Sequence, residues 1–259
     1  MRTDRYREAR RQHILELLDK HKTLSVNELS SRFRVSGTTI RLDLQALLEQ
    51  KWVIRTHGSV VKVREQPVSP LVERLQIHMD RKKAIGQAAA SLVNKEDIIG
   101  LDASSTALAM IPFLKELQPL TVVTNSIAVT NALITEERIR ILMPGGKVKH
   151  KNASLVGNSV VEYLKGLHLN TAFVGARSMS NDMGLGEADD EELEVKKTML
   201  HIAKTRVAVV DSSKYNGVAL VSFGSWEMID YLITDSYLNS KQREELKKLG
   251  VNVRIVDVD

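Results

Sequence analysis

Two short amphipathic segments near the start of the chain carry its clearest pattern of apolar and polar positions. In the first, Ser25 is followed three residues later by Glu28, a capping box in which each side chain satisfies a free backbone N–H of the first helical turn. A helix should therefore begin at Val26. The apolar positions that follow share one helix face: Val26, Leu29 and Phe33.

The second amphipathic segment follows after one short turn. Ser36 offers it an N-cap, and the helix is expected to run from Gly37 or Thr38 to about Gln50. Its inward positions are apolar: Ile40, Leu44, Leu47 and Leu48. The pair predicts a helix-turn-helix, whose second helix enters the major groove N-terminus first. The candidate DNA-contacting residues at its start are Ser36, Thr38, Thr39, Arg41 and Gln45.

The segments on either side extend this module. Residues 5–21 predict a further amphipathic helix that packs on the other two. Three of its arginines either contact phosphates or form a solvated face: Arg7, Arg10 and Arg11. Residues 52–63 hold two β-rich runs around a glycine, which predicts a hairpin and makes the module winged. At the wing tip, two residues either lie along the DNA or carry incidental charge: Arg55 and His57.

The rest of the chain has a different rhythm. Residues 65–80 begin with two prolines in four positions and are expected to link a DNA-binding domain at 1–64 to a second domain at 81–259. In that domain helical runs alternate with β-branched runs, which predicts an α/β fold with a mostly parallel sheet. The expected strands are 97–101, 120–124, 138–143, 171–174, 206–210, 231–234 and 251–256.

Several of these strands end in small polar residues. In open α/β sheets ligands bind at the carboxyl ends of strands, so the loops predict one crevice; ordinary capping and turn chemistry is the alternative for each loop taken singly. A phosphate would be held by hydroxyls and by Lys214, and sugar hydroxyls by Asp102 or Asn125. The candidates are Asp102, Ser104, Ser105, Thr106, Thr124, Asn125, Gly145, Gly146, Gly175, Asp211 and Lys214.

Composition fits a globular protein that is neither secreted nor embedded in a membrane. Of the 259 residues 43% are hydrophobic and 27% charged, and cysteine is absent, which excludes disulfides and thiolate zinc sites. The N-terminus is charged from Arg2 onwards, unlike a signal peptide, and Asp102 interrupts the longest apolar candidate span. We therefore expect a cytoplasmic protein without membrane contact, metal or cofactor.

Charge is divided unevenly along the chain. The net charge is +5, and residues 1–64 hold 14 Lys/Arg against 7 Asp/Glu, a net +7, which leaves −2 for the remainder. All of the basic excess therefore lies in the first module. This asymmetry indicates that the first module alone faces a polyanion, with double-stranded DNA as the expected partner and strong salt dependence as a consequence.

With both halves analysed, the chain resembles the DeoR family of bacterial transcriptional regulators over nearly its full length. The motifs of the DNA-binding half are Val35-Ser36, Thr39-Ile40-Arg41, Asp43-Leu44, Leu47 and Arg55-Thr56-His57-Gly58. Those of the second half are Asp102, Ser105-Thr106, Thr124-Asn125-Ser126, Gly145-Gly146, Phe173-Val174-Gly175, Gly184-Leu185, Lys196 and Ser213-Lys214. The resemblance implies a sugar-phosphate-isomerase-like fold for the second domain and a phosphorylated sugar as its effector.

The resemblance adds four candidate pocket or hinge residues: Arg74, Lys82, Glu192 and Lys196. A solvated helical face is the alternative for Lys196 and Lys197. The sequence also departs from the family pattern at Ser59 and at 103–104, and most informatively at two other positions. Leu42 stands where a second arginine is usual, and Arg177 where an acidic residue is common. Arg177 either favours a more anionic effector or plugs the pocket through a salt bridge to one of the acidic residues 189–192.

The sequence thus favours a DNA-binding regulator, most simply a repressor of a carbohydrate-use operon that responds to a phosphorylated sugar. A sugar-phosphate isomerase with a DNA-binding appendage is the main alternative. Against it, Arg177 stands where the isomerases that the second domain resembles have an acidic residue. An interaction module with a vestigial pocket is a third. Because helix-turn-helix proteins read symmetric half-sites, a homo-oligomer, dimer or tetramer, is expected.

Overall fold

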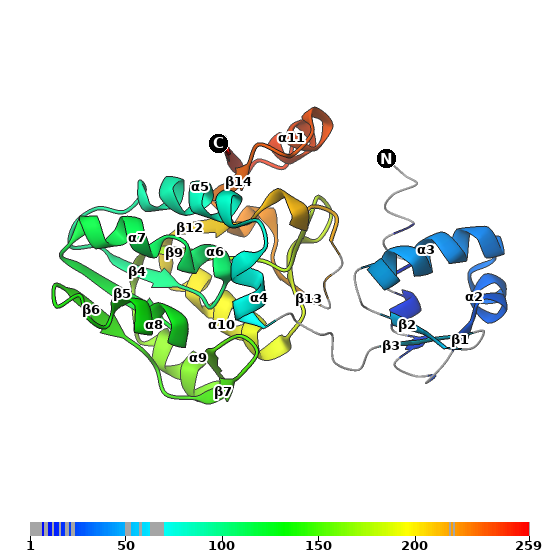
Figure 1. Cartoon of the computed structure of the whole chain (residues 1–259), viewed down its shortest axis with the longest axis horizontal. Coiled ribbons are helices and arrows are strands. Elements are labelled where there is room, and N and C mark those ends of the chain that lie inside the picture. Colours follow the sequence, from blue (N-terminus) through cyan, green and yellow to red (C-terminus); the bar gives the residue numbers. More distant parts are fainter. Residues whose placement is uncertain are drawn as a thin grey trace. The chain divides into compact units, whose positions relative to one another are not determined.

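The computed structural model of the chain describes residues 7, 10–11, 13–15, 17–18, 21, 24–49, 53–56, 59–62, 70–217, 219 and 221–258. The chain divides into two compact units, residues 1–68 and 69–259 (Figure 1). In the part of the chain that is described, no helix is both long and apolar enough to cross a bilayer.

The N-terminal unit contains the predicted helix-turn-helix. Helix α2 spans Val26–Phe33 and helix α3 spans Gly37–Glu49. The capping box is present, since the Glu28 N–H donates to Ser25 Oγ at 3.2 Å and the Ser25 N–H donates to Glu28 Oε2 at 2.7 Å. Arg34 ends α2 in the left-handed conformation, with φ of 52°, and so turns the chain towards α3.

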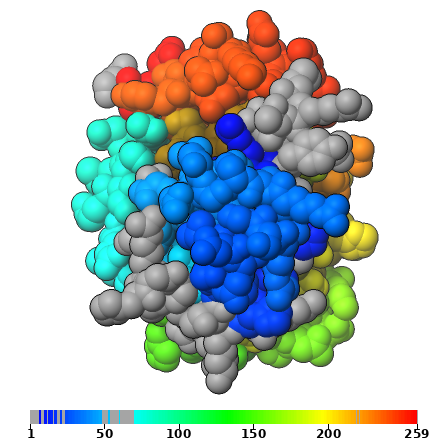
Figure 2. All heavy atoms as spheres, turned by 90° about the vertical axis from the view of Figure 1, so that its right-hand side faces the viewer, coloured from blue at the N-terminus to red at the C-terminus, as the bar shows by residue number. Residues whose placement is uncertain are grey.

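A three-stranded antiparallel sheet of order β1-β3-β2 completes this unit: β1 Leu24–Ser25, β2 Val53–Thr56 and β3 Ser59–Lys62. Strands β2 and β3 form the predicted hairpin. In the space-filling view the described atoms of the unit, in blue, form one closely packed body (Figure 2). Its buried apolar side chains are Ile14, Leu15, Leu18, Leu24, Leu29, Ile40, Leu44, Leu47, Val53 and Val60.

One charged side chain is buried inside this small core. Asp43 of α3 is 1% exposed and accepts hydrogen bonds from Arg10 Nε at 2.6 Å and Arg11 Nε at 3.1 Å. The pairing contradicts the expected solvated face for these two arginines, whereas the expected contact with phosphates stays a prediction. A buried carboxylate requires partnered charges, and Arg10 and Arg11 supply them.

The second unit is built on a seven-stranded sheet of order β15-β14-β12-β9-β4-β5-β6, in which every neighbouring pair is parallel. All seven predicted strands are present, which confirms the α/β fold class. They are β4 Ile98–Leu101, β5 Leu120–Thr124, β6 Ile139–Leu142, β9 Leu169–Val174, β12 Ala203–Val209, β14 Tyr231–Asp235 and β15 Asn252–Val256.

Helices cover both faces of the sheet (Figure 1). Alternate strand residues enter separate cores: Val207 and Val209 pack on one face, and Ala208 on the other. The first face carries α5 Met79–Ala90, α6 Ser105–Leu108, α7 Ile111–Leu114 and α8 Ile127–Leu133. The second carries α9 Asn158–Lys165, α10 Asp190–His201 and α11 Ser240–Lys247.

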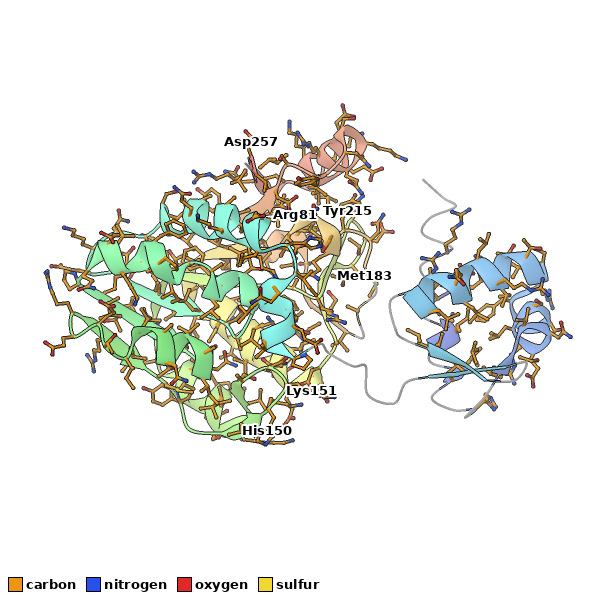
Figure 3. All side chains as sticks on the ribbon, viewed as in Figure 1. Arg81, His150, Lys151, Met183, Tyr215 and Asp257 are labelled. Carbon is orange, nitrogen blue, oxygen red and sulfur yellow. The ribbon has the colours of Figure 1, made fainter. Side chains whose placement is uncertain are left out.

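Several short elements do not belong to the predicted alternation of helices and parallel strands. They are the hairpin β7 Lys147–Lys149 with β8 Ser154–Val156, the antiparallel sheet of β10 Ser178–Ser180, β11 Gly184–Glu187 and β13 Val221–Gly224, and the 3₁₀ turns Lys115–Leu117, Ser212–Lys214 and Trp226–Met228. Helix α4, Leu71–Gln76, falls inside the stretch expected to be a linker. The Leu71 N–H donates to the carbonyl of Lys151, labelled in Figure 3, at 2.8 Å, so α4 packs with the second unit.

Candidate DNA-binding face and effector pocket

Helix α3 turns a polar face to solvent at the positions expected to contact DNA. Ser36 caps the helix, accepting the Thr39 N–H at 3.2 Å, and its hydroxyl lies 2.9 Å from Thr39 Oγ1. Both are therefore occupied in building the helix start. The exposed members of the set are Ser36, Thr38, Arg41 and Gln45. Of the wing residues, Arg55 lies in β2, and His57 falls outside the described residues.

A pocket of about 660 Å³, its open mouth included, lies at the carboxyl ends of β4, β9 and β12. From β4 the chain winds outward to β5 and β6, and it then returns to place β9 on the other side of β4. The winding direction of the sheet therefore reverses between β4 and β9. Ligands of open parallel sheets bind at such a reversal, where two strand-end loops diverge and leave a crevice.

Most residues proposed for effector binding come together in this pocket. They belong to α4, α5, α6, α10, the 3₁₀ turn Ser212–Lys214 and the loops after β4, β9 and β12. The lining includes Arg74, Lys82, Ser104, Ser105, Thr106, Gly175, Arg177, Glu192, Lys196, Asp211 and Lys214.

Four other candidates lie away from the lining: Thr124, Asn125, Gly145 and Gly146. Thr124 Oγ1 donates to the Leu101 carbonyl at 2.7 Å, and Asn125 Nδ2 donates to the Leu155 carbonyl at 3.0 Å. A Cβ on Gly146 would stand 2.6 Å from a methyl group of Val160. Their loops follow β5 and β6, on the far side of β4 from β9 and β12, where they hold neighbouring elements together. The structure therefore does not bring these four residues into the pocket lining.

Asp102 lies beneath the pocket rather than in its lining and supports it through Lys196. The Lys196 ammonium donates to Asp102 and, at 2.9 Å, to the Gly175 carbonyl, with Glu187 Oε2 at 3.5 Å. Burial alone would lower the pKa of Lys196, but the charges of Asp102 and Glu187 outweigh it, and the net pKa is raised. Lys196 is 4% exposed, so the solvated-face alternative is excluded for it.

The same carboxylate fixes the loops on both sides of the winding reversal. Asp102 Oδ1 accepts the Ser104 N–H at 3.1 Å and its hydroxyl at 2.6 Å, and Oδ2 accepts the Gly175 N–H at 2.9 Å. A Cβ on Gly175 would lie 2.4 Å from Ser104 Cβ, which explains why a glycine stands there. The pocket floor is thus pre-formed in the free protein.

Glu192 forms a second buried acidic group, this one on the pocket wall. It is 3% exposed and accepts hydrogen bonds from Ser154 Oγ and, at 3.0 Å, from Asn152 Nδ2. Burial raises the pKa of Glu192; the Ser154 bond and the Lys196 charge lower it, but by less. Such a carboxyl is suited to hydrogen bonding with a neutral hydroxyl group of a ligand.

Four cations line the pocket without carboxylate partners: Arg74, Lys82, Arg177 and Lys214. Within the described ranges, none of them forms an ion pair at 4.0 Å or less. Burial lowers the pKa of Arg74, Arg177 and Lys214, and the charges of Arg74 and Arg177 lower that of Lys214 further. Since burial disfavours the charged form of these cations, an anionic ligand would favour it.

Two members of the cluster are tied to helix α4. Arg74 Nε and Nη2 are buried and have no hydrogen-bond partner among the residues that are described. The ammonium of Lys82 donates to the carbonyls of Arg74 and, at 2.7 Å, of Ile77. Burial lowers the pKa of Lys82 to about 8, although the Asp211 charge raises it. The guanidinium of Arg74 thus has unused donors in a pocket wall, where leaving them unpaired is costly.

The salt bridge suggested between Arg177 and residues 189–192 is not formed in the described structure. Asp189 pairs with Lys149, and Glu191 pairs with Lys149 at 2.9 Å and with Lys147 at 3.0 Å. These contacts fasten hairpin β7–β8 to the start of α10. Arg177 lines the pocket instead. A salt bridge from Arg177 to residues 189–192 therefore does not close the pocket.

Five lining residues were absent from the predicted set: Ile77, Ala103, Asn152, Ala176 and Glu187. Asn152 lies in the turn of hairpin β7–β8, and Glu187 ends β11, both in elements that the hydrophobic pattern does not predict. The one available signal for Glu187 was its position two residues after the Gly184-Leu185 motif. Ile77 follows α4, in the stretch expected to be a linker.

A winged helix-turn-helix joined to an α/β unit with a cation-lined pocket defines a transcriptional regulator with a sensor domain. Two family descriptions match these units: "DeoR-like helix-turn-helix domain" over residues 10–66 and "DeoR C terminal sensor domain" over residues 77–236. The chain belongs to the DeoR family.

Curated relatives match along the whole chain. The "HTH-type transcriptional repressor GlcR" of Bacillus subtilis is 33% identical over 255 residues, 98% of each chain. The "HTH-type transcriptional regulator GolR" of Listeria innocua is 31% identical, covering 96% of this chain and 98% of its own. The "Glycerol-3-phosphate regulon repressor" of Escherichia coli is 28% identical, with 86% and 88% covered. The chain is accordingly a DNA-binding transcriptional regulator, and these relatives are named as regulators rather than as enzymes.

Among solved structures, ribose 5-phosphate isomerase A from Methanocaldococcus jannaschii matches with a TM-score of 0.39 and 21% identity, covering 53% of this chain and 54% of its own.

Proposed function

We propose that this regulator represses an operon of carbohydrate use, and that a phosphorylated sugar in the pocket of the second unit sets its affinity for double-stranded operator DNA. The observation that carries the proposal is the pair of buried, unpartnered guanidinium nitrogens of Arg74 within a cluster of unpaired cations. A phosphate supplies several acceptor oxygens and about two negative charges, which matches these donors.

Different lining residues suit the phosphate and the sugar of such a ligand. Arg74, Arg177 and Lys214 supply charged donors for the phosphate, and the hydroxyls of residues 104–106 supply neutral ones. The carboxyl of Glu192 and the amide of Asn152 supply acceptors and donors for sugar hydroxyls. The name of one relative includes a phosphorylated compound of this kind, since it is called a glycerol-3-phosphate regulon repressor.

Helix α4 offers a route from the pocket to the DNA-binding unit. It begins two residues after the boundary at 68/69 and carries Arg74. Its first N–H is held by Lys151 and its last carbonyls by Lys82, so a ligand that engages Arg74 acts on a segment fixed at both ends. If effector weakens operator binding, DNA must weaken effector binding equally, typically by about 1–3 kcal/mol of coupling.

The proposal excludes catalytic turnover. Enolisation of a sugar phosphate needs a carboxylate base that is free to accept a proton. Glu192 is held by hydrogen bonds from Ser154 and Asn152. Arg177 stands where the resemblance to the isomerases implies an acidic residue. Isomerisation of ribose or ketose phosphates by the purified full chain would overturn this part of the proposal.

The proposed regulator acts in the cytoplasm as a symmetric homo-oligomer, a dimer or tetramer, since a helix-turn-helix reads paired half-sites. Light scattering of the full chain with and without operator DNA measures this state.

Effector binding is tested by thermal shift with a panel of phosphosugars and the matching unphosphorylated sugars. A ligand at about 100 times its dissociation constant should add about 2.7 kcal/mol to the free energy of unfolding. We expect stabilisation by phosphosugars alone, and a change of operator affinity with the same compound. Stabilisation without any effect on operator affinity would leave a ligand-binding protein but reject the proposed switch.

A further inference from the structure

One apolar side chain lies in the middle of the exposed face of α3. Leu42 is 63% exposed and is the one exposed large apolar residue among the described side chains of the N-terminal unit. A single exposed leucine needs no explanation on an ordinary surface. Its position within the recognition helix makes this one informative.

Helical spacing places Leu42 at the centre of the DNA-facing side chains. Residues three and four apart are neighbours on a helix, so Thr38, Arg41, Leu42 and Gln45 form one stripe. The opposite face holds buried Ile40, Leu44 and Leu47. Because this face is packed, and because Asp43 is held by two arginines, the helix cannot rotate to bury Leu42.

The chemistry of a leucine restricts what it can contact in the major groove. It neither donates nor accepts a hydrogen bond, so it gains nothing from a phosphate or from the polar edge of a base. The apolar group that B-DNA presents in the major groove is the C5-methyl of thymine. We propose that Leu42 is a specificity-determining residue that selects thymine in each operator half-site by packing against this methyl group.

The test removes that methyl and nothing else. An operator is first selected from randomised duplex DNA with the full chain, and each thymine in it is then replaced singly by uracil, which keeps every hydrogen-bonding group. We expect one position in each half-site at which uracil weakens binding of the wild-type protein about fourfold, the value of one buried methyl group. Fluorescence anisotropy at fixed salt measures the dissociation constants.

The assignment to Leu42 comes from variants on the same DNA. Leu42→Ala should bind the thymine and uracil operators alike, while keeping its fold, because the side chain is exposed and alanine favours helix. Sites selected by Leu42→Arg should no longer hold thymine at that position. Ile134→Ala is the matched control, since Ile134 is 68% exposed in the sensor unit, and it should keep the wild-type preference.

Two results would overturn the inference. One is a wild-type protein that binds all of the uracil operators as tightly as the thymine operator. The other is a thymine preference that survives unchanged in Leu42→Ala, which would place the methyl contact on another side chain. Both results leave DNA binding itself intact, and so leave the function of the chain as a regulator untouched.

Discussion

The DNA-binding face of α3 and the effector pocket are both recognition surfaces, but they are built over different distances along the chain. The exposed face extends over residues 38–45 of one helix and is fixed by a cap and a small core. The pocket joins residues from 74 to 214, and its central ion pair, Lys196 with Asp102, spans 94 positions. A local surface should tolerate substitutions one at a time, whereas a surface assembled from distant segments depends on a few buried contacts.

The largest effect is expected from breaking the central pair. Lys196→Met leaves Asp102 buried without a counter-charge, which should lower the free energy of unfolding of the sensor unit by about 3–5 kcal/mol. Lys197→Met is the control, because its ammonium lies 3.8 Å from Glu194 in an exposed pair, and it should change stability by less than about 0.5 kcal/mol. Denaturant unfolding measures both. Similar losses in the two variants would contradict the role given to the buried pair.

The next effect concerns ligand binding without loss of the fold. Arg74→Gln removes charged donors from the pocket wall and should weaken binding of the most stabilising phosphosugar by about 1.5–3 kcal/mol, measured by calorimetry. Operator affinity without effector should stay unchanged. The control is Arg81→Gln. Arg81, labelled in Figure 3, donates to Ser212 and covers the Tyr237 ring, and it is not part of the pocket lining. Equal weakening in both variants would show that general charge, not Arg74, holds the ligand.

A smaller effect tests the local surface. Ser25→Ala deletes the N-cap of α2 and should destabilise the N-terminal unit by about 1 kcal/mol, with no change in phosphosugar affinity. Ser31→Ala, an exposed position within the same helix, is the matched control and should be neutral or slightly stabilising. Circular dichroism during denaturant unfolding reports both. A loss of ligand affinity in Ser25→Ala would show that the two surfaces are not independent.

The smallest effect is a pH dependence of the pocket. Burial lowers the pKa of Lys82 to about 8, and a bound anion favours the ammonium, so binding should raise this pKa. Phosphosugar affinity should therefore fall a few-fold as pH rises through 8, because the free protein then has to take up a proton. Lys82→Arg should lose this dependence, since arginine stays charged. A phosphosugar affinity that rises with pH over this range would contradict the prediction.

The distance along the chain between contacting residues also explains which features could be predicted from the sequence. The capping residues Ser25 and Ser36 predicted both helices to within a residue or two, because caps act on their own helix. β-branched runs predicted all seven parallel strands. The strand order could not be predicted, since it depends on which strands pair across the sheet.

That missing order accounts for the errors at the pocket. Asn125 and Gly146 come after β5 and β6, and their sequences resemble crevice loops, but these two strands lie on the other side of β4 from β9 and β12. Asn152 and Glu187 could not be predicted as pocket residues, because the short strands and turns that hold them have no hydrophobic periodicity. Arg10 and Arg11 looked like surface charges because their partner, Asp43, is more than thirty residues away.

The ion pairs of Asp43 also change how the charge of the N-terminal unit translates into DNA affinity. Each cation that meets a phosphate releases a condensed counterion and steepens the plot of log affinity against log salt by about 0.9. Arg10 and Arg11 share one buried carboxylate, which cancels one of their two positive charges. The salt dependence of this regulator should therefore report fewer phosphate contacts than the 14 Lys/Arg of residues 1–64 suggest.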